Sequence, residues 1–213
     1  MKWDMLCTYY SCLNQDYIYA NYPIFLAEIA STVNEVILSN YLIDNTDDID
    51  EKIYYLVEFL DKFKGTVYRQ VMFAEFENII HKKYENGEAL TKDLLCDEYY
   101  KLNVKHFSPS LIVDEDIKYE WARIPHFFTS FYVYKYATGF ISALVIAEKL
   151  INNEEGFKEK YINFLSSGCK DYPLNLLNEL GIDISSENVL DEAFNVFDSK
   201  VKLLKKYLDK KGV

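Results

Sequence analysis

Residues 23–41 read PIFLAEIASTVNEVILSNY, and their pattern of apolar residues recurs through much of the chain. Apolar side chains follow one another at intervals of three and four residues, which is the spacing of one face of an α-helix. Pro23 precedes the pattern, at a place where the first turn of a helix tolerates a residue without an N–H group. The spacing therefore predicts a helix over residues 24–41. Its apolar surface is expected to consist of Ile24, Phe25, Leu26, Ile29, Val33, Val36 and Ile37.

The rest of the chain follows the same periodicity, whereas the strict alternation that is typical of β-strands is rare. We therefore expect an all-α fold in which residues 1–213 form a single unit. A loop that begins at Ser108, Pro109 and Ser110 and contains Asp114, Glu115 and Asp116 interrupts the helices. The predicted helices are 48–86 (with a bend at Gly65 and an end at Asn86-Gly87), 90–103, 125–152 (opened by Pro125), 154–166, 173–180 and 187–210.

Composition excludes several classes of function. The 213 residues carry 34 acidic and 23 basic side chains and a net charge of −11, which argues against a protein that binds nucleic acid through its phosphates. No apolar run approaches the roughly 20 residues of a membrane span. The four cysteines are scattered, so we expect reduced thiols and a cytoplasmic location. With seven glycines, a glycine-rich phosphate loop is improbable.

Two glutamates on the first predicted helix are candidates for a chemical role. Glu28 stands among apolar neighbours, and Glu35 follows seven residues later, so both carboxylates project from nearly the same helical face. A carboxylate in apolar surroundings needs a cation, a hydrogen-bond donor or a metal ion. The alternative is a polar stripe in which Glu28, Ser31, Thr32 and Glu35 face water. The residues themselves leave both interpretations open.

A second candidate is the segment 122–139, ARIPHFFTSFYVYKYATG, which contains His126, one of three histidines. On the predicted helix Tyr132 and Tyr136 are one turn apart and share a face. An imidazole and phenols at the start of a helix can donate hydrogen bonds to a developing oxyanion. The alternative is an aromatic core stripe whose hydroxyl groups reach the surface.

Three stretches, in this order, resemble the C-terminal half of the catalytic domain of oligoendopeptidase F, a member of the thimet-oligopeptidase-like zinc metallopeptidases. They are YIYANYPIFLAEIASTVNE (17–35), FKGTVYRQVMFAEFE (63–77) and RIPHFFTSFYVYKYATG (123–139). The resemblance implies a hydrolase that cleaves peptide bonds in oligopeptides with the help of zinc. It implies that the chain is the helical C-terminal portion of such a domain.

The resemblance also implies roles for individual residues. Glu28 occupies the position of the third zinc ligand, and Glu35 resembles a second acid that orients a ligand histidine. His126 with Tyr132, or with Tyr136 as the second choice, resembles the groups that bind substrate and stabilise the oxyanion.

One feature of the family is missing. Where the family carries HExxH, with two zinc-binding histidines and a general base, residues 1–7 read MKWDMLC. Read in a shifted frame, codons for these residues can encode His-Glu-Met-Gly-His, so we hypothesise that Met1 is an out-of-frame start on the zinc-motif codons. We expect a catalytic domain truncated at the zinc-motif helix. Glu28 alone cannot hold a catalytic zinc ion tightly.

Three functions follow from these expectations. The first is a peptidase fragment that is inactive alone. The second is half of a split peptidase, completed by a separate N-terminal chain. The third is a helical peptide-binding module without chemistry. An oligopeptide substrate, an N-terminal peptidase fragment and a second copy of the chain are the expected partners, and exposed apolar surface left by truncation would favour self-association.

Overall fold

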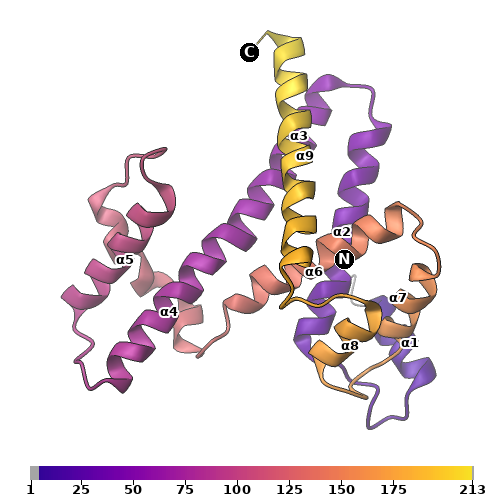
Figure 1. Ribbon diagram of the computed structural model, residues 1–213, viewed down its shortest axis with the longest axis horizontal. Coiled ribbons are helices and arrows are strands. Elements are labelled where there is room, and N and C mark those ends of the chain that lie inside the picture. The colour runs from indigo at the N-terminus through magenta and orange to yellow at the C-terminus, as the bar shows by residue number, and fades with distance from the viewer. Residues whose placement is uncertain (1–4, 213) are drawn as a thin grey trace. The chain divides into compact units, whose positions relative to one another are not determined.

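The computed structural model describes residues 5–212, and within this range it contains helices, turns and loops but no strand (Figure 1). The all-α fold predicted from the sequence is therefore confirmed. None of the helices in these residues combines the length and the apolar character of a membrane span. The helices are α1 (Met5–Asn14), α2 (Ile24–Asn45), α3 (Ile49–Phe63), the π-helical turn η1 (Lys64–Tyr68), α4 (Arg69–Glu85), α5 (Lys92–Phe107), the 3₁₀-helices η2 (Glu115–Arg123) and η3 (Pro125–Phe128), α6 (Tyr134–Ile151), α7 (Phe157–Leu165), α8 (Pro173–Leu180) and α9 (Glu187–Lys211).

The chain divides into two compact units. The first consists of the residues up to Lys64 and those from Thr138 onward, and the second consists of Gly65–Ala137. The single all-α unit expected from the sequence stays a prediction.

The first unit is built around α2, α3, α6 and α9. Helix α3 packs along α9 and against α2, and α1, α7 and α8 form a smaller group in which α7 contacts both of the others (Figure 1). The Phe63 ring, fully buried, lies against three other aromatic rings with centroids 4.4–5.8 Å away. These partners, Phe140 of α6 and Phe194 and Phe197 of α9, make Phe63 the point where α3, α6 and α9 meet.

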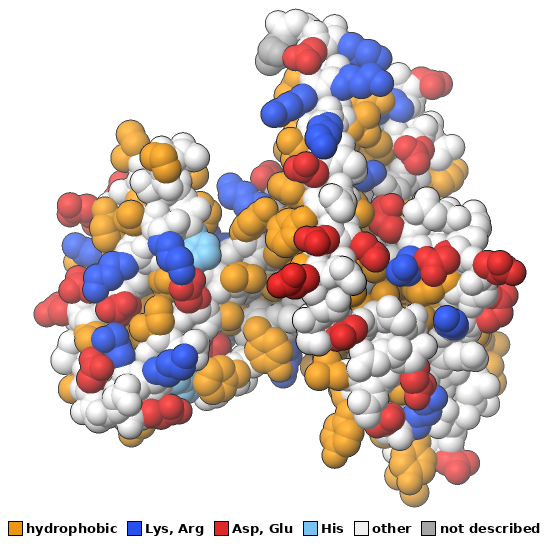
Figure 2. Space-filling model, in the orientation of Figure 1, with side chains coloured by type: hydrophobic (Ala, Val, Ile, Leu, Met, Phe, Trp, Pro, Cys, Tyr) orange, Lys and Arg blue, Asp and Glu red, His pale blue; other side chains and the backbone are white. Residues whose placement is uncertain are grey.

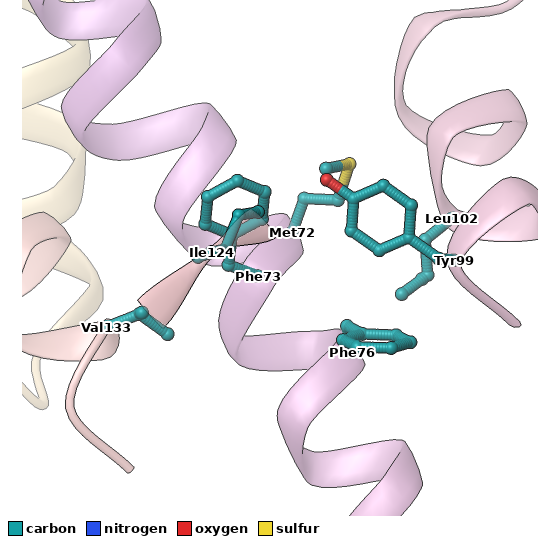
Figure 3. Close-up of a cluster of buried hydrophobic side chains, with 7 residues drawn as sticks. All are labelled: Met72, Phe73, Phe76, Tyr99, Leu102, Ile124 and Val133. Carbon is teal, nitrogen blue, oxygen red and sulfur yellow. The ribbon is translucent and has the colours of Figure 1, made fainter. Parts of the chain in front are cut away.

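The second unit packs α5 against both α4 and η2. Its core is a cluster of buried side chains drawn from α4, α5 and the segment that follows η2 (Figure 3). The members are Met72, Phe73, Phe76, Tyr99, Leu102, Ile124 and Val133. Two of its members, Ile124 and Val133, lie on either side of the segment that carries His126.

The predicted helix over 48–86 departs from α-helical geometry at the expected place. Asp48 caps α3 by accepting a hydrogen bond from the Asp50 N–H, and the helical path continues to Glu85. Between Lys64 and Tyr68 it widens into one π-helical turn, which includes Gly65. Such single π-turns inside long helices occur frequently at functional sites.

The prediction of one helix from Pro125 to Asn152 is wrong. Pro125 opens only the short helix η3, and α6 begins at Tyr134. The break lies at Phe131, whose φ of 54° is left-handed and incompatible with a continuing helix. Its N–H donates instead to the buried carboxylate of Glu77 on α4. Glu115 and Asp116, predicted to lie in a loop, form the start of η2, which Asp114 caps by accepting a hydrogen bond from the Asp116 N–H.

Candidate active site

His126, Tyr132 and Tyr136 lie together in the second unit. The Nε2 atom of His126 is 3.0 Å from the hydroxyl oxygen of Tyr136, within hydrogen-bond distance. The Tyr132 ring is stacked on the imidazole, with centroids 5.5 Å apart and an interplanar angle of 17°. The Tyr136 ring meets the imidazole edge-on at 89°, and each of the three side chains is partly exposed. The arrangement places an imidazole and two phenols beside one another at the surface of this unit.

Neighbouring apolar residues hold the segment that carries this group. Ile124, just before Pro125, is buried against α4 and α5 (Figure 3). Phe127 lies with its ring 5.4 Å from that of Phe73 and 5.2 Å from that of Phe76. Val133, between the two tyrosines, is fully buried. Because the residues on either side of His126 and Tyr132 are anchored in the core, the polar rings have little freedom to separate.

Both tyrosines considered in the sequence analysis contact the imidazole, but their positions on the chain differ from the prediction. Tyr136 lies in the first turn of α6, whereas Tyr132 precedes the helix and stacks on His126 from the turn that leads into it. Their rings are 5.5 Å apart. Tyr132 and Tyr136 therefore meet through a turn and not through a shared helical face.

A half-buried carboxylate lies a short distance along the chain from this group. Glu120 of η2 accepts hydrogen bonds from the Tyr99 hydroxyl at 2.7 Å and from the guanidinium groups of Arg69 and Arg123. Burial alone would raise the pKa of Glu120, but the Tyr99 hydrogen bond and the two arginines outweigh it and hold the pKa below its ordinary value. The pKa of the Tyr99 phenol is raised, first because Tyr99 is itself buried and then because its hydroxyl bonds to the Glu120 carboxylate. Glu120 thus ties η2 to α4 and α5.

Glu28 lies on α2 in the first unit, exposed between the buried residues Ala27 and Ile29. Among residues 5–212 there is no group of three His, Cys, Asp or Glu side chains that could hold a metal ion. A catalytic zinc ion takes three protein ligands and a water molecule, so the donors in the described part of the chain do not by themselves make such a site. Residues 1–4 of the MKWDMLC stretch lie outside the described residues.

Glu35 has a partner that the sequence analysis missed. Its carboxylate forms an ion pair with Lys62 of α3, and both side chains are partly exposed. The pair lines a cavity of about 320 Å³ in the first unit, between α2 and α3, with Phe140 of α6 contributing to its wall. Tyr55 and Glu58 add polar groups to the same cavity. Whether Glu35 orients a metal ligand stays a prediction.

Two acids of the second unit, the buried Glu77 and the half-buried Glu120, are absent from the sequence prediction. Both hold the segment that carries His126, because Glu77 bonds to Phe131 and Glu120 bonds to Arg123. Residues 71–80, VMFAEFENII, contain Glu75 and Asn78 as well as Glu77, so the sequence does not mark Glu77 as a buried acid. Periodicity alone could not identify its partner, which lies 54 residues away.

Comparison with known proteins agrees with the fold and the motifs. The model of peptidase family M3 matches residues 5–196. The chain is 41% identical over 203 residues to the oligopeptidase PepF of Bacillus subtilis (strain 168), and the match covers 95% of this chain and 30% of that protein. It is 44% identical over 197 residues to the plasmid-encoded oligoendopeptidase F of Lactococcus lactis subsp. cremoris, with coverage of 92% and 33%.

A solved structure shares the same arrangement of helices. The crystal structure of oligoendopeptidase-F from Enterococcus faecium superimposes with a TM-score of 0.87 at 39% sequence identity, and covers 97% of this chain and 37% of that one. The chain therefore spans about a third of the length of these relatives. From the match over residues 5–196 and these similarities, the chain belongs to peptidase family M3.

Proposed function

We propose that this chain supplies the substrate-binding and oxyanion-stabilising part of an oligoendopeptidase F-like zinc metallopeptidase, and that it does not hydrolyse peptides alone. One observation carries the proposal: the His126 imidazole is within hydrogen-bond distance of the Tyr136 hydroxyl and stacked against Tyr132. Family membership supports the class of reaction, the hydrolysis of peptide bonds in oligopeptides.

The group of rings suits the charge that develops during peptide hydrolysis. Attack on a peptide carbonyl places negative charge on its oxygen, and preorganised donors aimed at that oxygen stabilise the tetrahedral intermediate. With a proton on Nε2, His126 donates to the Tyr136 oxygen, and the Tyr136 hydroxyl can then donate its own proton to the substrate. Stacking on Tyr132 holds the imidazole plane in place. Removal of one such donor typically costs about 10²–10³ in turnover.

We assign Glu28 the role of third ligand in a zinc site whose other ligands come from an HExxH segment. The exposed position of Glu28 on α2 supports this role, because a ligand to a shared metal ion must be reachable from outside its own helix. The ion would polarise the scissile carbonyl and activate a water molecule. The described residues do not supply two further ligands beside Glu28, so this chain is not expected to form the catalytic zinc site without a partner.

A polypeptide equivalent to the rest of an M3 peptidase is the partner that we propose. Met5, Tyr9 and Leu13 lie four residues apart on α1, and their exposed fractions are 69%, 60% and 64%. They form an apolar stripe on the outer side of a helix whose Cys7 and Ser11 are buried toward α7. Hydrophobic side chains also reach the surface elsewhere, among charged ones (Figure 2). Such exposed stripes are typical of surfaces that another polypeptide covers.

The test is a peptide-cleavage assay with zinc, with and without a separately produced segment of the Bacillus subtilis relative that contains HExxH. Peptide hydrolysis is expected only when both polypeptides are present. Leu13→Asp, which disrupts the apolar stripe on α1, is expected to lower the rate of hydrolysis. Hydrolysis by this chain alone would contradict the proposal. Micromolar peptide binding without turnover in either mixture would favour the peptide-binding module, and formation of homodimers through the stripe would favour self-association.

A further inference from the structure

Glu77 is a buried carboxylate in the middle of α4, with an exposed fraction of 1%. Burying a carboxylate is costly unless its oxygens are hydrogen-bonded. Here the carboxylate accepts a hydrogen bond from the backbone N–H of Phe131, a residue 54 positions later in the chain. The acid therefore stabilises one particular turn of the backbone, and does so from a neighbouring helix.

That turn has an unfavourable conformation. Phe131 has a φ of 54°, in the left-handed region that a bulky residue rarely adopts. Such a residue persists when its surroundings determine its conformation. Helix α4 makes two contacts with Phe131. The Glu77 carboxylate accepts a hydrogen bond from its backbone N–H, and the His81 ring, one helical turn later, lies against its ring at a tilt of 34° with centroids 4.5 Å apart.

The turn determines where the next side chain points. Tyr132 follows Phe131 directly and stacks on His126, while Val133 enters the core. If Phe131 relaxed to a negative φ, the backbone would leave the turn in another direction and Tyr132 would move away from the imidazole. We propose that Glu77 is a positioning residue, which holds Phe131 in the left-handed conformation and thereby keeps Tyr132 against His126. The positioning stands on its own; its importance for peptide hydrolysis rests on the proposed function.

The three histidines allow a specific test by NMR on the chain without peptide or zinc. The stacked Tyr132 ring shifts the imidazole proton signals of His126, and Tyr132→Leu defines the signal without this effect. Glu77→Leu is expected to lose most of the same shift and to alter the His81 signal as well. Glu75→Leu is the matched control, because Glu75 lies two residues earlier on α4 and pairs with Lys105 and His106. It is expected to move the His106 signal and leave that of His126 unchanged.

Two further variants separate positioning from general destabilisation. Glu77→Gln keeps an acceptor oxygen and is expected to retain the His126 shift. In the double variant Glu77→Leu/Phe131→Gly the shift is expected to return, because glycine adopts a positive φ without steric cost. If Glu77→Leu does not fold, Glu77→Asp, which withdraws the carboxylate by one methylene, is expected to reduce the shift partly. A folded Glu77→Leu protein (or, in its place, a folded Glu77→Asp protein) with the wild-type His126 shift would overturn the proposal.

Discussion

The hydroxyl oxygen of Tyr136 lies 3.0 Å from Nε2 of His126, and the two side chains come from different helices, α6 and η3. This pairing leads to the first prediction. Tyr136→Phe removes the hydroxyl and leaves the ring contacts, so it is expected to lower the free energy of unfolding by about 1 kcal/mol. In the peptidase assembled from two polypeptides it is expected to lower turnover by about 10²–10³.

Tyr132→Phe is the matched control for this prediction. The ring stacks on the imidazole whether or not it carries a hydroxyl, so the variant is expected to keep the His126 NMR signal near its wild-type position. Comparing the two variants by urea unfolding and by peptide hydrolysis separates the effect of the Tyr136 hydroxyl, which bonds to His126, from that of the Tyr132 hydroxyl. Equal turnover in Tyr136→Phe and the wild type would remove Tyr136 from the mechanism.

The second prediction concerns the stability of the fold at acid pH. The pKa of folded Glu120 lies below the ordinary value of 4.5, so its ionised form stabilises the folded state at pH above that value, and this contribution is lost as the pH falls through the folded pKa. Glu120→Gln is expected to cost about 2 kcal/mol at pH 7, because hydrogen bonds to a charged group are lost.

Urea unfolding at pH 7 and pH 4 measures this effect. The difference in stability between wild type and Glu120→Gln is expected to shrink as the pH is lowered below 4.5, since the unfolded chain takes up the proton more readily than the folded one. Glu115→Gln, on the exposed side of the same 3₁₀-helix, is the control and is expected to change stability little at either pH. A Glu120→Gln penalty that is unchanged with pH would contradict the assignment.

The third prediction uses Gly139, which lies in α6 and is buried. An added Cβ would be 3.7 Å from Phe25 and 3.8 Å from Ile29, both ordinary van der Waals distances. Gly139→Ala is therefore expected to raise the free energy of unfolding by about 0.5–1 kcal/mol, because alanine favours the helix more than glycine does. Thermal unfolding measures the change, and the reverse substitution Ala143→Gly on the same helix should lower it. A loss of stability in Gly139→Ala would mean that α2 and α6 lie closer together than described.

The fourth prediction tests the metal role of Glu28. In the assembly with an HExxH-containing segment, Glu28→Gln is expected to weaken zinc binding by at least about 100-fold, since one of three protein ligands is lost. Glu35→Gln is expected to weaken it by about 10–100-fold if Glu35 orients a ligand histidine. Competition with a zinc-sensitive dye gives both affinities. Glu58→Gln, which removes an acid from the cavity beside Glu35, is the control and should leave zinc binding unchanged.

Local sequence signals predicted much of the fold but not the connections between distant residues. The start of α2 at Ile24 and of α8 at Pro173 could be predicted because proline and apolar periodicity act within one or two turns. The end of α2 lies at Asn45, beyond the predicted Tyr41, where Thr46 leaves the helical conformation.

The break before α6 could not be predicted from its own residues. Residues 125–139 have apolar and aromatic side chains at helical spacing, and the interruption depends on Glu77, which contacts Phe131 from another helix. The same reason applies to Glu35, whose ion pair joins it to Lys62 across 27 residues. His126, Tyr132 and Tyr136 could be singled out as candidates because they lie within eleven consecutive residues, 126–136, although their mutual geometry depends on the turn.

The central claim is that His126, Tyr132 and Tyr136 together bind a peptide. An NMR titration of the chain with an oligopeptide that is not cleaved tests this claim most directly. The account predicts that the His126 signal shifts in a saturable manner while that of His106 stays in place, and that Tyr136→Phe weakens the binding. Saturable peptide binding that leaves the His126 signal unmoved, or no binding at millimolar peptide, would contradict it.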